Sequence, residues 1–289
     1  MVARLTAWFP PPADAVSRRV TVDGIAMHVV EAGQGPPVLL IHGLGWDGSM
    51  WSPTVDLIAG DHHVVTADTR GHGASDAPPG PYTIAGFARD YAALLDALRL
   101  EQVVVVGLSQ GGMVAQTLAL TRPDLVAALV LVSTASRSDP AAREHMEARL
   151  SATERDGAAA AARLAVESIF SPSWRAANPS AVERFVAWRT AMPLGPLAAA
   201  TRAAYGFDLT GDLSCIAVPT LVVAGGADRL TPPSGMEDIA ARIPGARYVV
   251  VPDAGHILPV ERPDAFHGHL LSFLAALATS GTPVWPATG

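Results

Sequence analysis

Three residues far apart in the sequence could together catalyse acyl transfer. Ser109 stands between a run of four valines, residues 103–106, and an apolar helical segment, while Asp228 and His256 each follow an expected strand. A serine hydroxyl is a weak nucleophile at neutral pH, so it needs a neighbouring base, and the base needs an acid that orients it. The chain order Ser, Asp, His is one in which such triads occur. The three residues therefore predict a nucleophile, a base and an orienting acid.

The sequence around Ser109, Gly107-Leu108-Ser109-Gln110-Gly111, predicts a sharp turn between a strand and a helix. Glycine is needed at both flanking positions, where a Cβ would collide with neighbouring backbone, and the serine is held exposed at the tip of the turn in a strained conformation. The N-terminus of the following helix favours negative charge beside it. The pattern alone is common by chance, but the buried strand and the helix that flank it favour a nucleophile over a serine chosen for the turn.

Other residues compete for two of these roles. Asp253 or Asp212 could take the place of Asp228 as the orienting acid, and both stay open at this point. The competing interpretation of His256 is a loop histidine that makes only a structural hydrogen bond. The preferred set remains Ser109, Asp228 and His256.

We expect neither a metal site nor a cofactor. The adjacent pair His62-His63 would lie on a strand, where neighbouring side chains point to opposite faces. His267 and His269 are two residues apart on an expected helix, and their side chains diverge as well. Neither pair can converge on one ion.

The composition excludes several classes of function. The net charge is −7 and the pI is about 5.7, with no run of basic residues, so neither nucleic acid nor an anionic membrane is expected as a partner. All 20 basic residues are arginine, which excludes a lysine Schiff base and a Walker-type phosphate loop. The single cysteine, Cys215, cannot form an internal disulfide, and we expect it to be a buried structural thiol.

The sequence carries no sign of export or of a membrane anchor. Residues 1–12 lack the apolar run and the cleavage site of a signal peptide, and no window approaches the roughly 20 apolar residues of a membrane span. We therefore expect a cytoplasmic protein that acts on a small-molecule substrate. The oligomeric state is not decided by the sequence, and a homodimer stays open.

Strands alternate with helices along most of the chain, which predicts an α/β fold with a mostly parallel central sheet and helices on both faces. The hairpin signal Asp23-Gly24, between 19–22 and 26–30, predicts two antiparallel edge strands. The other expected strands are 38–41, 64–68, 103–106, 129–133, 219–228 and 246–251, and the expected helices of the core are 50–59, 84–98, the segment from 113 to Pro123, 234–242 and 263–277.

The composition changes between residues 136 and 213, where apolar runs stop and Ala, Arg and Glu dominate. This segment is too long for an ordinary connection between two strands, so we predict a helical cap with helices near 144–150, 158–170, 181–192 and 196–205. The predicted organisation is a core domain made of two segments, residues 1–135 and 214–278, with the cap at residues 136–213 between them and a flexible tail at residues 279–289.

The ordered motifs resemble those of the α/β-hydrolase-fold serine hydrolases, and the resemblance covers nearly the whole core. Histidines 42 and 72 within these motifs are expected to brace their loops. The motifs that carry the resemblance are His42-Gly43, Asp68-Thr69-Arg70-Gly71-His72-Gly73, Gly107 to Gly111, and Gly255-His256.

The resemblance implies a role for each candidate residue. Ser109 is the nucleophile, His256 is the general base and acid, and Asp228 fixes the tautomer of the imidazole. The backbone N–H groups of Gln110, which follows the nucleophile, and of Leu44, in the loop after His42-Gly43, form the oxyanion hole.

Apolar side chains near these motifs could line a substrate pocket, although core packing competes as the explanation for each of them. As a group they suggest a hydrophobic or aromatic acyl or alcohol moiety. Arg137, Arg175 and Arg189 could meet a substrate carboxylate, or they could lie on solvated helix faces. The pocket candidates are Trp46, Met113, Trp174, Trp188, Met192 and Ile257, with Met50, Trp51 and Leu258 beside them.

We predict a metal-free serine hydrolase that cleaves an ester or lactone of a small, largely apolar substrate, similar in its motifs to the enol-lactonase and carboxylesterase branch. The same triad would also serve hydrolysis of a carbon–carbon bond in vinylogous diketones. A ligand receptor, or a non-hydrolytic catalyst such as a cyclase or lyase, can be built on the same fold. An aspartate nucleophile, as for epoxide or haloalkane hydrolysis, is disfavoured because Ser109 occupies the turn.

Overall fold

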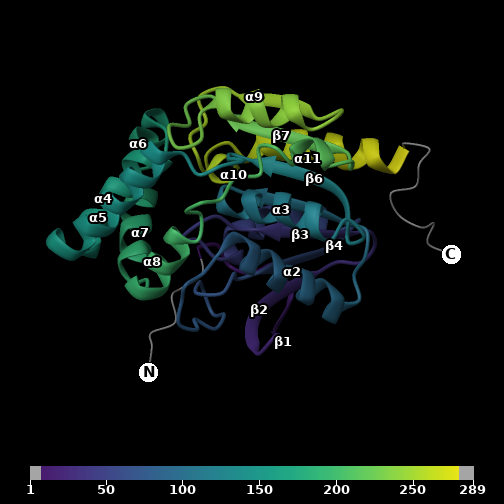
Figure 1. The fold of residues 1–289 in the computed structure, drawn as a ribbon, viewed down its shortest axis with the longest axis horizontal. Coiled ribbons are helices and arrows are strands. Elements are labelled where there is room, and N and C mark those ends of the chain that lie inside the picture. The colour runs from purple at the N-terminus through teal and green to yellow at the C-terminus, as the bar shows by residue number, and fades with distance from the viewer. Residues whose placement is uncertain (1–7, 280–289) are drawn as a thin grey trace.

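A twisted sheet forms the centre of the computed structural model, which describes residues 8–279 (Figure 1). Within these residues the sheet has eight strands in the order β1-β2-β4-β3-β5-β6-β7-β8, parallel from β4 to β8, so the predicted mostly parallel sheet is confirmed. The strands are β1 (Val16–Val22), β2 (Ile25–Ala32), β3 (Pro37–Ile41), β4 (His63–Ala67), β5 (Val103–Leu108), β6 (Val126–Val132), β7 (Thr220–Gly225) and β8 (Arg247–Val251).

The first two strands form the predicted antiparallel hairpin, but only β1 lies at the edge of the sheet. Asp23 and Gly24 have φ angles of 48° and 79°, as the tight turn requires. On its other side β2 pairs antiparallel with β4, so the prediction of two edge strands was wrong for β2. The reason is visible in Ile25, Met27 and Val29, whose side chains alternate along β2 and are buried in the core.

Helices cover both faces of the sheet because its central strands are apolar on both faces. In β5, Val103 and Val105 belong to the apolar cluster that contains residues of α2, α3 and α9, while Val104 and Val106 belong to the cluster that contains residues of α1 and α11. The predicted helices on both faces are therefore confirmed. The core helices are η1 (Gly48–Trp51), α1 (Ser52–Ile58), α2 (Ile84–Leu98), α3 (Gln110–Thr121), η2 (Leu213–Cys215), α9 (Pro233–Arg242), α10 (Leu258–Glu261) and α11 (Pro263–Thr279).

Five helices, here called the helical insertion, connect β6 to β7 and gather beyond the ends of these strands (Figure 1). Sequence reasoning missed α6, which begins at Pro172 and is capped by the Ser171 hydroxyl. The division into core and cap at residues 136 and 213 stays a prediction. The helices are α4 (Pro140–Asp156), α5 (Ala158–Ile169), α6 (Pro172–Ala177), α7 (Pro179–Thr190) and α8 (Leu194–Arg202).

An aromatic cluster joins the helical insertion to the core. Trp46, from the loop after β3, lies 5.4 Å from Phe185 and 5.2 Å from Trp188 between ring centroids, and both of these residues belong to α7. Trp8 lies 5.3 Å from Trp46 and donates its backbone N–H to the Ser49 hydroxyl. Because these rings are almost fully buried, they attach α7 firmly to the loop after β3.

Cys215 is exposed, which corrects the prediction of a buried thiol. The short η2 turn buries Leu213 in the core and leaves Cys215 facing solvent. The predicted tail lies outside the described residues except for Thr279, which ends α11. Among the helices of residues 8–279, none is both long enough and apolar enough to cross a membrane.

Truncation of Phe185 should destabilise the protein strongly. The Phe185→Ala variant removes a ring that is 1% exposed, and we expect a loss of about 3–5 kcal/mol in the free energy of unfolding. Chemical unfolding followed by tryptophan fluorescence measures the loss. Leu164→Ala is the matched control in the same insertion, because Leu164 is 47% exposed and its truncation should change stability little. Equal effects of the two substitutions would contradict the attachment described above.

Candidate active site

The turn that carries Ser109 is closed by two backbone contacts that exclude a Cβ. A Cβ on Gly107 would collide with the carbonyl of Gly111, and a Cβ on Gly111 would collide with the carbonyl of Ile41 at the end of β3. Ser109 itself has a φ of 54° and a ψ of −118°, outside the usual regions for a non-glycine residue. Its N–H donates to the Val132 carbonyl at 2.9 Å, which anchors the turn to β6. The hydroxyl is therefore held at the tip between β5 and α3.

The structure brings Ser109, His256 and Asp228 into one line of hydrogen bonds. The Ser109 Oγ lies 2.8 Å from His256 Nε2, and His256 Nδ1 lies 2.9 Å from an Asp228 carboxylate oxygen. Asp212 and Asp253 are exposed, and of the three carboxylates only Asp228 is bonded to His256. This is the geometry that a nucleophile, its base and an orienting acid require.

The carboxylate of Asp228 is held by hydrogen bonds that sequence reasoning did not identify. The backbone N–H groups of Leu230 and Thr231 donate to one of its oxygens at 2.8 and 3.0 Å, and the Thr231 hydroxyl donates to the other at 2.6 Å. Burial alone would raise the pKa of Asp228, but the neighbouring His256 and the hydrogen bonds from Thr231 outweigh burial and lower it. Asp228 therefore stays ionised. A threonine three residues after an aspartate at a strand end was the available signal.

The two predicted oxyanion donors lie beside Ser109. Leu44 and Gln110 both line the cavity that contains the Ser109 hydroxyl, and the loop after β3 approaches so closely that a Cβ on Gly43 would lie 3.3 Å from the Ser109 Cβ. Within residues 8–279, no protein acceptor is bonded to the N–H of Leu44 or of Gln110. Both donors are thus available to a ligand oxygen, and their catalytic role stays a prediction.

Two buried histidines brace the loop that carries Leu44. The His42 Nδ1–H donates to the Gly43 carbonyl at 2.8 Å, while its Nε2 accepts the Thr69 N–H at 2.9 Å. The His72 Nε2 accepts the Gly45 N–H at 3.1 Å. Burial lowers the pKa of both rings, that of His72 to about 3, and the neighbouring titratable ring of His42 contributes to the latter. Both rings are therefore neutral, which leaves each Nε2 able to accept.

Glu261 connects the loop of the catalytic histidine candidate to the helical insertion, and sequence reasoning missed it. One oxygen of its buried carboxylate accepts the N–H groups of Gly255 and Ser171, each at 3.0 Å. The N–H of His256 donates to the Ile169 carbonyl at 2.8 Å. The loop that positions His256 is thus held against the junction of α5 and α6. An acidic residue directly after the apolar stretch 257–260 was the only local signal.

A cavity of about 1190 Å³ opens over Ser109 and His256. Its apolar walls near the nucleophile come from Leu44, Met113 and Leu230, and the insertion closes it with residues of α4, α5 and α8. The side chain of Gln110 donates to the carbonyl of Ala200 in α8 at 2.8 Å, so the helical insertion also contacts the turn that carries the nucleophile.

Of the six predicted pocket residues, only Met113 lines this cavity. The other five do not line it, because their large apolar side chains are buried in packing contacts. Trp46 and Trp188 belong to the aromatic cluster, and Trp174 stacks on Phe170 at 4.5 Å between ring centroids. The five residues buried in the core are Trp46, Trp174, Trp188, Met192 and Ile257.

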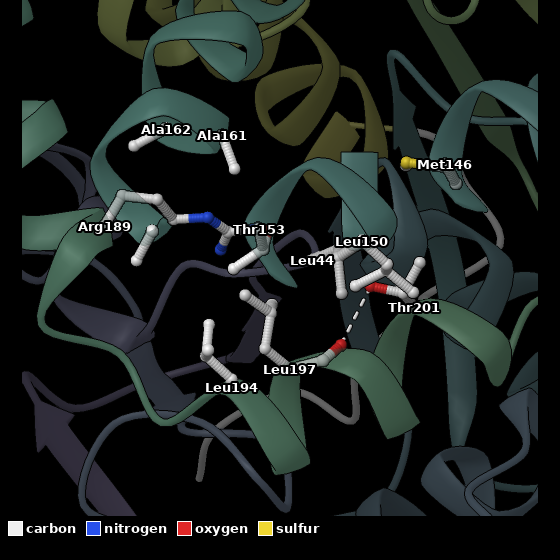
Figure 2. Close-up of a pocket in the computed structure, with 11 residues that line it drawn as sticks. Leu44, Met146, Leu150, Thr153, Ala161, Ala162, Arg189, Leu194, Leu197 and Thr201 are labelled. Atoms are coloured by element: carbon white, nitrogen blue, oxygen red, sulfur yellow. Dashed lines mark hydrogen bonds between the residues drawn. The ribbon is translucent and has the colours of Figure 1, made fainter. Parts of the chain in front are cut away.

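Among the three arginines considered for substrate binding, Arg137 lines the large cavity and Arg189 lines a second cavity of about 40 Å³. Figure 2 shows Arg189 extending into this small cavity, with Ala161 and Ala162 on one side and Leu194 and Leu197 on the other. Its guanidinium packs directly against the glycine that follows Leu44, where a Cβ would overlap it. The small cavity is too small for a substrate, so Arg189 supports the loop of Leu44.

Metal-ligating side chains are not grouped in the portion of the chain that the structure describes. No set of three or more His, Cys, Asp or Glu side chains there could hold a metal ion together.

Comparison with known proteins gives consistent matches. The sequence model of a family described as alpha/beta hydrolase fold matches residues 36–263. A protein of Caulobacter sp. (strain K31) with the provisional name carbamate hydrolase RutD is 34% identical, over 89% of this chain and 98% of its own length. The 3-oxoadipate enol-lactonase 2 of Acinetobacter baylyi is 30% identical, over 86% and 92%. The crystal structure of the enol-lactonase from Burkholderia xenovorans LB400 superposes with a TM-score of 0.84 at 32% identity, covering 89% of this chain and all of that one.

Removal of the acceptor at position 261 should slow the reaction of Ser109. In Glu261→Leu two buried N–H groups lose their acceptor, each at a cost of about 1–3 kcal/mol, and the loop of His256 shifts. We expect modification of Ser109 by a fluorophosphonate to slow by about tenfold or more. Glu261→Gln keeps a carbonyl oxygen for both donors and should remain within about threefold of the parent rate.

The control is Asp90→Asn, which weakens another buried ion pair, that with Arg70, away from His256. All rates are compared at equal folded fraction. If Glu261→Leu slowed the modification no more than Asp90→Asn does, Glu261 would serve stability alone and not the position of His256.

Stability should fall as the pH falls from about 6.5, in part because of His72. Its pKa drops on folding from an ordinary value of 6.5 to about 3, so between these values the unfolded chain binds a proton that the folded chain does not. His72→Gln keeps an acceptor for Gly45 and binds no proton. We therefore expect a smaller loss of unfolding free energy between pH 7 and pH 5 in this variant, measured by urea unfolding. An unchanged pH dependence, matching that of His269→Gln on α11, would refute the assignment.

Proposed function

The chain belongs to the α/β-hydrolase family and is a hydrolase, and on that premise we propose that it cleaves a carboxylic ester or lactone through an acyl-enzyme on Ser109. The observation that carries the proposal is the unbroken line of hydrogen bonds from Ser109 through His256 to the buried Asp228, at 2.8 and 2.9 Å. This line ends at a hydroxyl that faces a large cavity. The enol-lactonases among its relatives support cleavage of an ester-type bond.

In the first half of the proposed reaction, Ser109 Oγ attacks the carbonyl carbon while His256 Nε2 takes its proton. Asp228, ionised and bonded to Nδ1, stabilises the imidazolium that forms. The negative charge that develops on the carbonyl oxygen meets the N–H groups of Leu44 and Gln110. Each such donor contributes about 2.7–4 kcal/mol to transition-state stabilisation in comparable enzymes. His256 then gives its proton to the leaving oxygen, and the carbon–oxygen bond breaks.

In the second half, a water molecule attacks the acyl-enzyme and His256 takes its proton. The second tetrahedral intermediate collapses, the proton returns to Ser109 Oγ, and the carboxylic acid is released. For a lactone the leaving oxygen stays attached to the acyl chain, so the same steps open the ring. The neutral His42 and His72 hold the loop of Leu44 still through both halves.

We further propose that the helical insertion, within residues 136–213, acts as a cap that encloses the substrate. Residues of α4 and α5 line the cavity opposite the nucleophile, and α8 accepts the side-chain hydrogen bond of Gln110. An enclosed site strengthens the electrostatic contacts to the developing oxyanion, because it keeps bulk water away from them.

Replacement of Ser109 tests the proposal. We expect Ser109→Ala to lose p-nitrophenyl acetate turnover by about three orders of magnitude or more, and to lose covalent labelling by a fluorophosphonate probe. Ser168→Ala is the matched control, because this serine lines the same cavity and its hydroxyl bonds only within its own helix, to the carbonyls of Leu164 and Ala165. Labelling or turnover that persisted in Ser109→Ala would rule out the acyl-enzyme. The values of kcat/KM for a panel of esters, lactones and carbamates then show which type of bond the protein cleaves best.

A further inference from the structure

The cavity over Ser109 has a charge balance opposite to that of the whole chain. The protein carries a net charge of −7, yet among the residues whose side chains the structure describes, five arginines and four carboxylates line this cavity. Two of the carboxylates already have an arginine beside them, since Asp238 bonds Arg242 at 2.8 Å and Asp156 lies 3.9 Å from Arg155. The other charged residues described in the lining are Arg137, Arg143, Arg229, Asp139 and Glu167.

Three arginines of the lining carry no ion pair. Among the described residues, no carboxylate oxygen lies within 4.0 Å of the guanidinium nitrogens of Arg137, Arg143 or Arg229. They come from three separate elements, the chain after β6, the first turn of α4 and the chain after β7. All three side chains are exposed, and all three line this region of the cavity. They make this region attractive to an anion.

Arg143 is the arginine best prepared to bind an anion. Its guanidinium carbon lies 5.3 Å from the centre of the Tyr205 ring, which lines the same cavity. Stacking on an aromatic ring restricts the side chain and leaves the N–H groups at the edge of the guanidinium available. These N–H groups form a planar fork that matches the two oxygens of a carboxylate.

We propose that the substrate carries a carboxylate remote from its scissile bond, and that Arg143 binds this carboxylate while Arg137 and Arg229 attract it. The inference rests on the proposed function, and it narrows the substrate to an ester or lactone with an anionic end. The volume of about 1190 Å³ exceeds what a short acyl chain fills, so there is room for such an end. The apolar surface of Leu44, Met113 and Leu230 then receives the portion of the molecule beside Ser109.

A contact remote from the reacting atoms should appear in KM. The carboxylate makes the same contact to Arg143 in the ground state and in the transition state, so loss of the contact weakens binding without slowing the chemical steps. An effect on kcat with KM unchanged would instead place Arg143 among groups that act on the transition state.

The test compares two probes that share the same nitrophenyl ester and differ at the far end of the acyl chain. Mono-4-nitrophenyl glutarate ends in a carboxylate there, and its methyl ester is neutral. We expect the parent protein to prefer the acid in kcat/KM by about tenfold, and Arg143→Gln to lose this preference through a rise in KM of the same size. The methyl ester should be hydrolysed equally by both. Arg163→Gln is the matched control, because Arg163 is an exposed arginine of α5 that pairs with Glu183 and does not line the cavity. Added salt should reduce the preference of the parent protein.

Two outcomes would overturn this inference while the proposed function stands. One is equal hydrolysis of the two probes by the parent protein. The other is a preference for the acid that survives in Arg143→Gln, which would remove Arg143 from the binding site. A failure of turnover with both probes, together with absent fluorophosphonate labelling, would overturn the proposed function and this inference with it.

Discussion

The close approach of α3 to the ends of β3 and β5 is the constraint on which the whole site depends. Gly107 and Gly111 touch neighbouring backbone where any Cβ would collide, and this contact forces Ser109 to the tip of the turn with a φ of 54°. The strain is acceptable because the strands on either side are buried and their register is fixed. A larger residue at either glycine would move α3 away and carry the hydroxyl out of reach of His256, which is 2.8 Å distant.

Buried polar side chains then fix the loops that the sheet alone leaves undetermined. His72 holds the N–H of Gly45, Asp228 holds those of Leu230 and Thr231, and Glu261 holds that of Gly255. In each case one side chain accepts from a loop at the end of a strand, so the loop cannot move without leaving a buried donor unpaired. The lowered pKa values of His72 and Asp228 agree with these hydrogen bonds. A neutral His72 ring can accept the Gly45 N–H, and an ionised Asp228 can accept a hydrogen bond from the imidazole of His256.

The features of this architecture that could be predicted from sequence are those with local signals. The valine run of β5 predicts a strand buried on both faces, and the glycines around Ser109 predict the turn, because backbone geometry depends largely on residues nearby in the sequence. Large apolar residues carry no such information. Trp188 was expected at the pocket and lies in the core, since its burial depends on which surface α7 meets. Glu261 gave almost no signal, because its donors come from residues 255 and 171, and the latter is remote in sequence.

The use of aromatic residues for attachment has a consequence for selectivity. Phe185 and Trp188 of α7 pack against Trp46 and do not line the cavity. The walls of the cavity opposite Ser109 come instead from α4 and α5, whose lining residues are mostly charged or small. A cavity of this kind discriminates by charge and hydrogen bonding more sharply than by apolar shape, since an unmatched buried polar group costs more than a missing methylene. The helical insertion contacts the proposed catalytic groups on both sides, through Gln110 and through the loop of His256. The walls of the cavity and the proposed catalytic groups are therefore connected by hydrogen bonds to two helices of the same insertion, α5 and α8.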